Sequence, residues 1–321
     1  MEHTYKHIAQ SDPSEAISIS GDYKIKNLAS LSYDTITNYN TALQKNLECK
    51  MAFLSADQSK WSASDLTYKY ILAVIMNPIL TTGEINLMCE CIMMYIKLKR
   101  VCIPTDIFLN LKRGQTEYGS YGTALSVLTD NLETNTFPVS MNWLQGNLNY
   151  LSSVYHSCAM IGYEKAMKKM KDYDFTIRWM VHSDDNATSI VVRGDLKKLL
   201  SSFNCSSLSE LLFRSIQSHF KSYCITLNPK KSYASESEVE FISERIINGA
   251  VIPLYCRHLA NCSTESSHNS YFDDLMSLSI HITMLLRKGC PNELIPFAYA
   301  AIQVQSLSIY SMLPGEENDS S

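Results

Sequence analysis

One stretch of the sequence, residues 175–193 (FTIRWMVHSDDNATSIVVR), constrains the fold more than any other. It contains two runs rich in β-branched and aromatic residues, separated by Ser183, Asp184, Asp185 and Asn186. Runs of this composition favour strands, while Ser, Asp and Asn favour turns because their side chains hydrogen-bond to nearby backbone. The stretch therefore predicts a β-hairpin with an acid pair at its tip.

Adjacent acids carry little information by themselves. With 32 acidic residues among 321 positions, chance predicts about three adjacent pairs, and three pairs occur. The pair Asp184 and Asp185 differs from the others in its context, because like charges between apolar strands cost free energy unless a cation offsets them. Taken alone, the pair is more readily interpreted as a polar hairpin tip in contact with water.

A second strand also ends on an acid. Residues 51–57 (MAFLSAD) form a short apolar run whose last residue is Asp57, which is typical of a buried central strand that carries a carboxylate at its end. Two magnesium ions need several oxygen ligands from rigid elements, and strand ends are rigid. We therefore expect Asp57 and Asp184 to lie on adjacent strands with their carboxylates on the same side.

A polar cluster opens the long helical pattern that precedes the hairpin. Gln145, Gly146 and Asn147 lie at its start, and Ser152 and Ser153 follow within the helix. Such a platform suits a sugar or a template backbone. The alternative is an N-capped amphipathic helix without a ligand.

Two further groups follow the hairpin. The turn at residues 228–232 (NPKKS) carries Lys230 and Lys231, either of which could protonate or neutralise a leaving pyrophosphate, although exposed lysines are usually only solvated. The run at residues 240–244 (EFISE) ends on Glu244, which could complete a metal shell or simply face water. Each of these signals is weak alone, and their order along the chain is what makes them informative.

The rest of the pattern mixes strands and helices irregularly, which predicts an α+β fold rather than a doubly wound sheet. Residues 1–50 are polar, with one possible helix at 32–48, and residues 101–139 are typical of an insertion lying over a core. Short strands are expected at 224–229 and 232–235, followed by a hairpin about Asn248 and Gly249. Helices are predicted over residues 62–80, 83–99, 145–172 and 195–223, and from residues 271 and 291 onward.

Composition argues against several classes of protein. The N-terminus lacks the apolar stretch of a signal peptide, and the longest apolar run, residues 70–80, is too short to span a bilayer. The ten cysteines are scattered without a disulfide framework, so we expect a soluble protein of a reducing intracellular compartment. A net charge of −4 argues against a stand-alone nucleic-acid binder, but a carboxylate cluster that binds metal would itself contribute negative charge.

Five segments, taken in order, resemble motifs A to E of the RNA-dependent RNA polymerase in the L protein of segmented negative-strand RNA viruses, the bunyavirus group. They are LSADQSKW (54–61), WLQGNLNYLSS (143–153), HSDDN (182–186), NPKKSYAS (228–235) and EFISE (240–244). The Ser-Asp-Asp form of the third segment is the version used by that group, and the wording is most similar to the nairovirus L protein. The resemblance extends from residue 51 to the C-terminus.

The resemblance implies a right-hand polymerase fold, in which an antiparallel palm sheet is flanked by helices and joined to part of the fingers and the start of a helical thumb. It divides the chain into a lead-in segment of the fingers (1–50), the palm with motif A (51–100), a fingers insertion (101–140), the palm with motifs B to E (141–250) and the start of the thumb (251–321).

The resemblance also implies roles for individual residues. The groups that would hold two Mg²⁺ or Mn²⁺ ions are Asp57, the Gln58 carbonyl, Asp184, Asp185 and Glu244. Those that would contact nucleotide or template are Lys60, Trp61, Gln145, Gly146, Asn147, Ser152, Ser153 and Ser183. Lys230 or Lys231 would be the motif D lysine, which acts on the leaving pyrophosphate.

The implied activity is template-directed RNA synthesis for viral genome replication and transcription, in which an RNA 3′ hydroxyl attacks a nucleoside triphosphate and pyrophosphate leaves. The implied partners are RNA template and product, nucleoside triphosphates, the rest of the L protein and nucleoprotein-coated RNA, in the host cytoplasm and the virion. The basic fingertip motif and the cap-snatching endonuclease of such proteins are not recognisable in this sequence. The chain therefore resembles a fragment, which we expect to bind RNA weakly and to be inactive alone.

Other interpretations of the residues stay open. The acids could be solvated in a non-catalytic interaction module, or they could serve a two-metal nuclease, which would cleave RNA without nucleotides. Cys256, His258, Cys262 and His268 are zinc-ligand types, but their spacing fits no standard finger, which favours accidental clustering. His182, beside the acid pair, is interpreted as a strand residue facing the core rather than as a general base.

Overall fold

The structure, a computed structural model, describes residues 1–58, 61, 66–114, 119–129, 132–139, 148–253, 255–261 and 270–310. The chain divides into two compact units, Met1–Ile242 and Ser243–Ser321. Helices and strands alternate irregularly in the first unit, and its sheets are antiparallel, which confirms the predicted α+β class.

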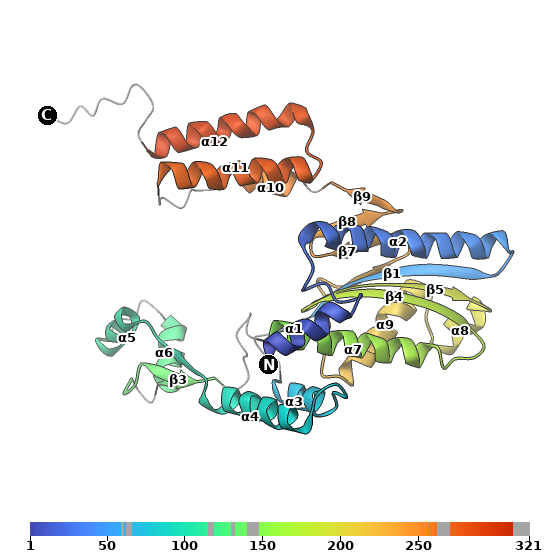
Figure 1. The fold of residues 1–321 in the computed structure, drawn as a ribbon, viewed down its shortest axis with the longest axis horizontal. Coiled ribbons are helices and arrows are strands. Elements are labelled where there is room, and N and C mark those ends of the chain that lie inside the picture. The colour runs from blue at the N-terminus through green and yellow to red at the C-terminus, as the bar shows by residue number, and fades with distance from the viewer. Residues whose placement is uncertain are drawn as a thin grey trace. The chain divides into compact units, whose positions relative to one another are not determined.

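The first unit contains sixteen helices and strands within its described residues (Figure 1). Its helices are α1 (Glu2–Ser11), α2 (Gly21–Gln44), α3 (Tyr68–Ile75), α4 (Thr82–Leu98), α5 (Thr105–Lys112), α6 (Gly119–Leu128), α7 (Asn149–Met167), α8 (Leu196–Ser202) and α9 (Leu208–Lys221). Its strands are β1 (Cys49–Asp57), β2 (Arg100–Cys102), β3 (Thr136–Pro138), β4 (Asp174–His182), β5 (Asp185–Arg193), β6 (Tyr233–Ser235) and β7 (Glu238–Phe241).

The main sheet of this unit has four antiparallel strands in the order β4–β5–β1–β6. β1 pairs with β5 along its whole length, with Cys49 opposite Arg193 and Asp57 opposite Asp185. β4 and β5 form the predicted hairpin, and their turn consists of Ser183 and Asp184. The ends of three strands therefore meet at the edge of the sheet that carries the acids.

Both faces of the sheet are covered, with α2 on one side and α7 and α9 on the other (Figure 1). The face toward α7 and α9 carries the main apolar core, to which the sheet contributes residues such as Leu54 and Ile190. On the face toward α2, the Thr35 hydroxyl donates to the Ser189 hydroxyl at 2.8 Å. Burial on both faces explains why the sequence of β1 is apolar without strict alternation.

The N-terminal segment differs from the expectation of a single helix in residues 32–48. It forms two helices, and α1 packs against α7. The Glu2 carboxylate accepts hydrogen bonds from the backbone N–H groups of Tyr150 and Leu151, at 2.9 and 3.3 Å. These N–H groups lie in the first turn of α7 and have no partner within the helix, so Glu2 stabilises its N-terminus.

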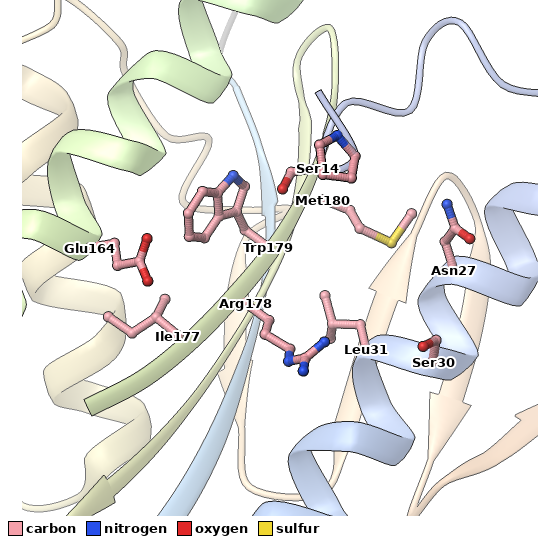
Figure 2. A pocket seen from close by; sticks show the side chains of 10 residues that line it. Ser14, Asn27, Ser30, Leu31, Glu164, Ile177, Arg178, Trp179 and Met180 are labelled. Atoms are coloured by element: carbon pink, nitrogen blue, oxygen red, sulfur yellow. The ribbon is translucent and has the colours of Figure 1, made fainter. Parts of the chain in front are cut away.

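The outer edge of β4 is partly covered by the segment between α1 and α2. The Val181 N–H donates to the Ser14 carbonyl at 2.9 Å, and the Ala16 N–H donates to the Val181 carbonyl at 2.8 Å. Beside this short parallel pairing lies a hollow with a volume of about 450 Å³. Figure 2 shows side chains that line it, from α2, α7 and β4. It is lined by Pro13, Ser14, Asn27, Ser30, Leu31, Glu164, Ile177, Arg178, Trp179 and Met180. The acids at the hairpin tip do not line this hollow.

The second unit begins with the hairpin of β8 (Glu244–Ile247) and β9 (Ala250–Ile252). Its turn residues, Asn248 and Gly249, have φ values of 50° and 82°, as the predicted tight turn requires. Four further elements follow among the described residues of this unit, and α11 packs against α12. They are α10 (Tyr255–Asn261), α11 (Tyr271–Arg287), η1 (Asn292–Leu294) and α12 (Ile295–Ile309).

One prediction of local structure was incorrect. Residues 224–229 form no strand, and the pairing there is a single bridge between Gln58 and Leu227. The described residues of the region 101–139 contain small elements of their own, α5, α6 and most of the β2–β3 ribbon. Within the described residues, no helix is both long enough and apolar enough to cross a membrane.

Candidate active site

The centre of the candidate site is a pair of acids on adjacent strands. Asp57 is the last residue of β1 and lies opposite Asp185, the first residue of β5. The Gln58 N–H donates to the Asp184 carbonyl at 3.2 Å, so the neighbouring pair Asp57–Asp185 is of the non-hydrogen-bonded type. Side chains of such a pair lie on the same face, with Cβ atoms about 4.5–5.5 Å apart. Like charges so placed repel each other.

This register corrects one expectation. The sequence predicted that Asp57 would share a side with Asp184 on an adjacent strand, but the residue opposite Asp57 is Asp185. Asp184 lies in the turn, because only Ser183 and Asp184 connect the two strands. Asp184 still belongs to the site, since its charge and that of Asp57 each raise the pKa of Asp185.

The electrostatics of the site oppose full ionisation. Burial and, after it, the charges of Asp184 and Asp57 together raise the pKa of Asp185 to about 7. Burial and the charge of Asp57 also raise the pKa of Asp184. Lys231 acts in the opposite direction on both groups. A carboxyl group whose pKa is raised to near 7 by burial and neighbouring acids is characteristic of functional sites.

The turn that follows α9 holds Asp57 in place. Asn228 donates from its side-chain amide to Asp57 Oδ2 at 3.1 Å, and from its backbone N–H to the Asp57 carbonyl at 2.8 Å. The Asp57 N–H donates to the Ser232 hydroxyl at 3.0 Å. Lys231 Nζ lies 3.6 Å from Asp57 Oδ1. The structure thus brings the lysine-bearing turn to the first strand end.

Helix α7 contacts the hairpin turn through the side chain of His156. The ring is completely buried, and burial lowers the pKa of His156 to about 4, so it is neutral at pH 7. Its Nδ1 lies 2.9 Å from the Ser183 carbonyl, which can only accept, so Nδ1 carries the proton. Its Nε2 therefore accepts from the Gln58 side-chain amide at 3.4 Å. The residue after Asp57 is thereby linked to the hairpin turn.

Several predicted residues have surroundings that the sequence did not indicate. Ser152 and Ser153 are completely buried in α7, where a hydroxyl is not presented to a template. Ser152 donates to the Asn149 carbonyl at 3.0 Å. Trp61 is buried, with Lys69 Nζ 4.6 Å from its ring centroid. These side chains support the site from within.

The other predicted residues lie at the surface or outside the acid pair. Lys230 is exposed, and its backbone N–H donates to the Asn228 side chain at 3.1 Å. Glu244 belongs to the second unit, where its carboxylate forms an ion pair with Lys288. The predictions for Lys60, Gln145, Gly146 and Asn147 lie outside the described residues, as do two members of the proposed zinc cluster, Cys262 and His268.

The donor set suits a divalent cation in part. Carboxylates of Asp57, Asp184 and Asp185 are the ligand type that Mg²⁺ and Mn²⁺ prefer, and their mutual repulsion would be relieved by a cation. In the described part of the chain, no group of three or more His, Cys, Asp or Glu side chains is arranged closely enough to hold a metal ion. The backbone therefore brings the ligands to one edge, while their side chains are not drawn together.

Sequence reasoning missed the acids of the N-terminal segment. Glu15 is buried and accepts a hydrogen bond from the Ser153 hydroxyl at 2.6 Å, and Asp12 accepts one from the Ser157 hydroxyl. No motif marks either acid, and the only signal available was their place in a short turn after α1. The fold and the site together define an α+β protein in which acids at the strand ends repel one another at one edge of an antiparallel sheet.

Comparison with known proteins identifies the family. Residues 1–321 match the family described as Bunyavirus RNA dependent RNA polymerase. The chain is 66% identical over 322 residues to RNA-directed RNA polymerase L of Tomato spotted wilt virus (strain Brazilian Br-01), covering 100% of this chain and 11% of that protein. The chain belongs to the bunyavirus RNA-dependent RNA polymerase family.

More distant relatives agree with this assignment. RNA-directed RNA polymerase L of European mountain ash ringspot-associated virus is 31% identical over 317 residues, covering 97% of this chain and 14% of that protein. The protein of the same name from Bunyavirus La Crosse is 28% identical over 356 residues, covering 99% of this chain and 15% of that protein. The chain thus spans between 11% and 15% of the length of these three relatives.

Proposed function

We propose that this chain carries the catalytic acids of an RNA-directed RNA polymerase, which transfers a nucleotide from a nucleoside triphosphate to an RNA 3′ hydroxyl and releases pyrophosphate. The observation that supports this most is the pairing of Asp57 with Asp185 on adjacent strands, with the pKa of Asp185 raised to about 7. Family membership supplies the reaction class. In this proposal the four-stranded sheet is the polymerase palm, residues 101–140 belong to the fingers, and the second unit begins the thumb.

The acids would hold two divalent cations, Mg²⁺ or Mn²⁺, with Asp57 and Asp184 as shared ligands and Asp185, the Gln58 carbonyl and Glu244 as further ligands. When bound, the ions lower the pKa of the RNA 3′ hydroxyl and neutralise the departing pyrophosphate. For Glu244 to act in this way, its carboxylate would have to exchange Lys288 for a cation. The repulsion among the acids favours cation binding.

Other groups would position the substrates. Lys231, already 3.6 Å from Asp57 Oδ1, is better placed than Lys230 to act on the leaving pyrophosphate. In the proposed motif B loop, Gln145, Gly146 and Asn147 would contact template and nucleotide. Trp61, Ser152 and Ser153 would support these contacts from within, since all three side chains are buried.

The proposal extends to the setting of the reaction. The chain would act with RNA template and product, nucleoside triphosphates, the remainder of the L protein and nucleoprotein-coated RNA, in the host cytoplasm and the virion, for genome replication and transcription. Within the family, the 66% identity to the Tomato spotted wilt virus protein supports a polymerase of that kind. The finer resemblance to nairovirus L protein gains no support from the three relatives described above.

The test is Asp184→Ala in the complete polymerase, assayed for templated nucleotide incorporation with Mn²⁺. Loss of an acid that holds both ions should lower the rate by at least about a thousandfold, because several kcal/mol of transition-state stabilisation disappear. The melting temperature in EDTA should equal or exceed that of the wild type, since one repelling charge is removed.

A matched control is Asp174→Ala. Asp174 is the first residue of β4 and pairs with Arg193 at 2.7 Å, so the same change is made in the same hairpin, far from the turn. It should leave incorporation within about threefold of wild type. Incorporation within about threefold of wild type by Asp184→Ala would contradict the proposal.

A further inference from the structure

Glu15 is the most fully hydrogen-bonded acid among the described residues of the N-terminal segment, and its side chain is buried. Its Oε1 accepts from the Ile17 N–H at 2.7 Å and from the Ser153 hydroxyl at 2.6 Å. Its Oε2 accepts from the Ser18 N–H at 3.3 Å and from the Ser18 hydroxyl at 3.2 Å. All four groups donate, so Glu15 serves only as an acceptor.

The Ser153 hydroxyl forms a directed bridge. A hydroxyl has one proton, and here it is donated to Glu15, so the lone pairs of the Ser153 oxygen face the other way. They accept the Ser183 N–H at 3.2 Å. Glu15 therefore determines the orientation in which Ser153 can bind the hairpin turn.

The Ser183 peptide groups are held on both sides by the same helix. Its N–H donates to Ser153, and its carbonyl accepts from His156, one turn further along α7. Ser183 itself has φ of 56°, a conformation that costs a non-glycine residue free energy and persists only when its surroundings enforce it. The two residues that follow Ser183 are the acids Asp184 and Asp185.

We propose that Glu15 is a positioning residue for the strand-end acids: through the Ser153 hydroxyl it holds the Ser183 peptide in its left-handed conformation, and so sets the direction of Asp184 and Asp185. This inference rests on the proposed function, because it gives the turn geometry a role in binding divalent cations. It assigns to the N-terminal segment a part in the site, which no sequence motif indicated. Neither Glu15 nor Ser153 contacts a substrate in this role.

A second link between the same two elements offers a comparison. Asp12 accepts a hydrogen bond from the Ser157 hydroxyl, one turn beyond Ser153 on α7. Ser153 and Ser157 are equally buried, at 0% and 1% exposure, and both bind an acid of the N-terminal segment. Only Ser153 also contacts the hairpin turn. If the segment merely anchored α7, the two serines would be equivalent.

The experiment compares Ser153→Ala with Ser157→Ala in the complete polymerase. The first measurement needs no catalysis: amide hydrogen exchange, followed by mass spectrometry, in peptides that span residues 181–187. Ser153→Ala should accelerate exchange of the turn by at least about tenfold, because the Ser183 N–H loses its acceptor, whereas Ser157→Ala should not.

The second measurement is the Mn²⁺ concentration that gives half-maximal incorporation. Loss of a group that orients metal ligands typically weakens metal affinity by about 10- to 100-fold. Ser153→Ala should therefore need at least about tenfold more Mn²⁺, and Glu15→Ala should behave in the same way. Ser157→Ala should need the same concentration as wild type. These results together would support the proposal.

Equal effects of the two serine substitutions, on exchange of the turn and on the Mn²⁺ requirement, would overturn the proposal, since the segment would then act only as an anchor. The same holds if Ser153→Ala lowers the maximal rate but leaves the Mn²⁺ requirement unchanged. Asp184→Ala, assayed in parallel, distinguishes a failure of the proposed function from a failure of this inference. If it retains activity, the proposed function fails, while the exchange comparison still decides whether Ser153 holds the turn.

Discussion

Glu15 and Asp185 are acids of the same unit, but their carboxylates have opposite surroundings. Four donors reach Glu15, two from backbone N–H groups and two from serine hydroxyls. No hydrogen bond to the Asp185 carboxylate is found among the described residues, and its nearest charged influences include Asp184 and Asp57. Burial raises the pKa of both groups, but the donors around Glu15 oppose this effect, whereas the acids around Asp185 add to it. Glu15 therefore satisfies buried donors, while Asp185 is available to a cation.

The largest expected effect on stability is that of Glu15→Ala. The substitution leaves buried donors of Ile17, Ser18 and Ser153 without an acceptor, and each such group costs about 1–3 kcal/mol. We expect the free energy of unfolding to fall by roughly 2–4 kcal/mol, because some donors will find water. Urea unfolding of the purified chain measures this.

The control for that comparison is Glu236→Ala, at a glutamate whose side chain is 51% exposed and lies 3.8 Å from Lys50. Its effect should stay within about 0.5 kcal/mol, as for other surface ion pairs. If Glu15→Ala is as mild as this control, the carboxylate of Glu15 does not organise the segment around it.

The second prediction has the opposite sign. Asp185→Asn removes one of the repelling charges without changing the size of the side chain, so in EDTA at pH 7.5 it should raise the free energy of unfolding by roughly 1–2 kcal/mol. Thermal or urea unfolding measures the change. A loss of stability would show that Asp185 has favourable partners and that the contrast with Glu15 is false.

The pH dependence follows from the raised pKa of Asp185. In the unfolded chain the group titrates near 3.8, and in the folded protein near 7, so the folded state binds more protons between these values. The contribution of Asp185 to stability therefore falls as the pH rises from about 4 to about 7, and the full loss is present above 7. The difference in unfolding free energy between wild type and Asp185→Asn, measured in EDTA across this range, should grow with pH.

The pH dependence must be measured as a difference between wild type and Asp185→Asn, because the titration of His156 changes stability with pH in the opposite direction. Burial lowers its pKa to about 4, so the unfolded state binds more protons between pH 4 and 6.5, and stability rises over that interval. The contribution of His156 is common to both proteins and cancels in the difference. A difference that is independent of pH would mean that Asp185 is ionised in the folded protein throughout.

The smallest effect is expected from Lys231→Ala. The lysine side chain is 67% exposed, and its Nζ lies 3.6 Å from Asp57 Oδ1, so its ion pair should contribute less than about 0.5 kcal/mol to stability. The variant has a second measurable consequence. Lys231 lowers the pKa of Asp185, so its removal should raise the pH at which half of the Asp185-dependent change in unfolding free energy has occurred. An unchanged midpoint would show that Lys231 does not influence the acid cluster.

The local pattern was sufficient to predict several elements. The sequence predicted β1 and the β4–β5 hairpin, because their apolar runs end in turn-forming or acidic residues, and the structure confirms them. The Asn248–Gly249 hairpin is confirmed as well, because its turn requires two positive φ values, which these residues adopt readily. These elements depend on interactions between neighbours in the chain.

The register of the site could not be predicted in the same way. Asp184 was expected on a strand adjacent to that of Asp57, but the two-residue turn includes Asp184, and Asp185 lies opposite Asp57. One residue of difference in turn length changes which acid begins the strand, and composition does not specify turn length. Helix α1 and the first part of α2 were not predicted for a related reason: their polar sequences are stabilised by packing on α7 and the sheet, not by a strong pattern of their own.

By itself, the sequence determined which chemical groups are present and in what order: acids at the ends of two apolar strands, a lysine-bearing turn, and the five segments that resemble polymerase motifs. Only the tertiary structure decided which of these groups meet. Glu15 and Ser153 are separated by 138 residues along the chain, and yet the Ser153 hydroxyl binds the Glu15 carboxylate directly. Such contacts depend on how helices pack across a sheet, and packing is a property of the whole core rather than of any segment.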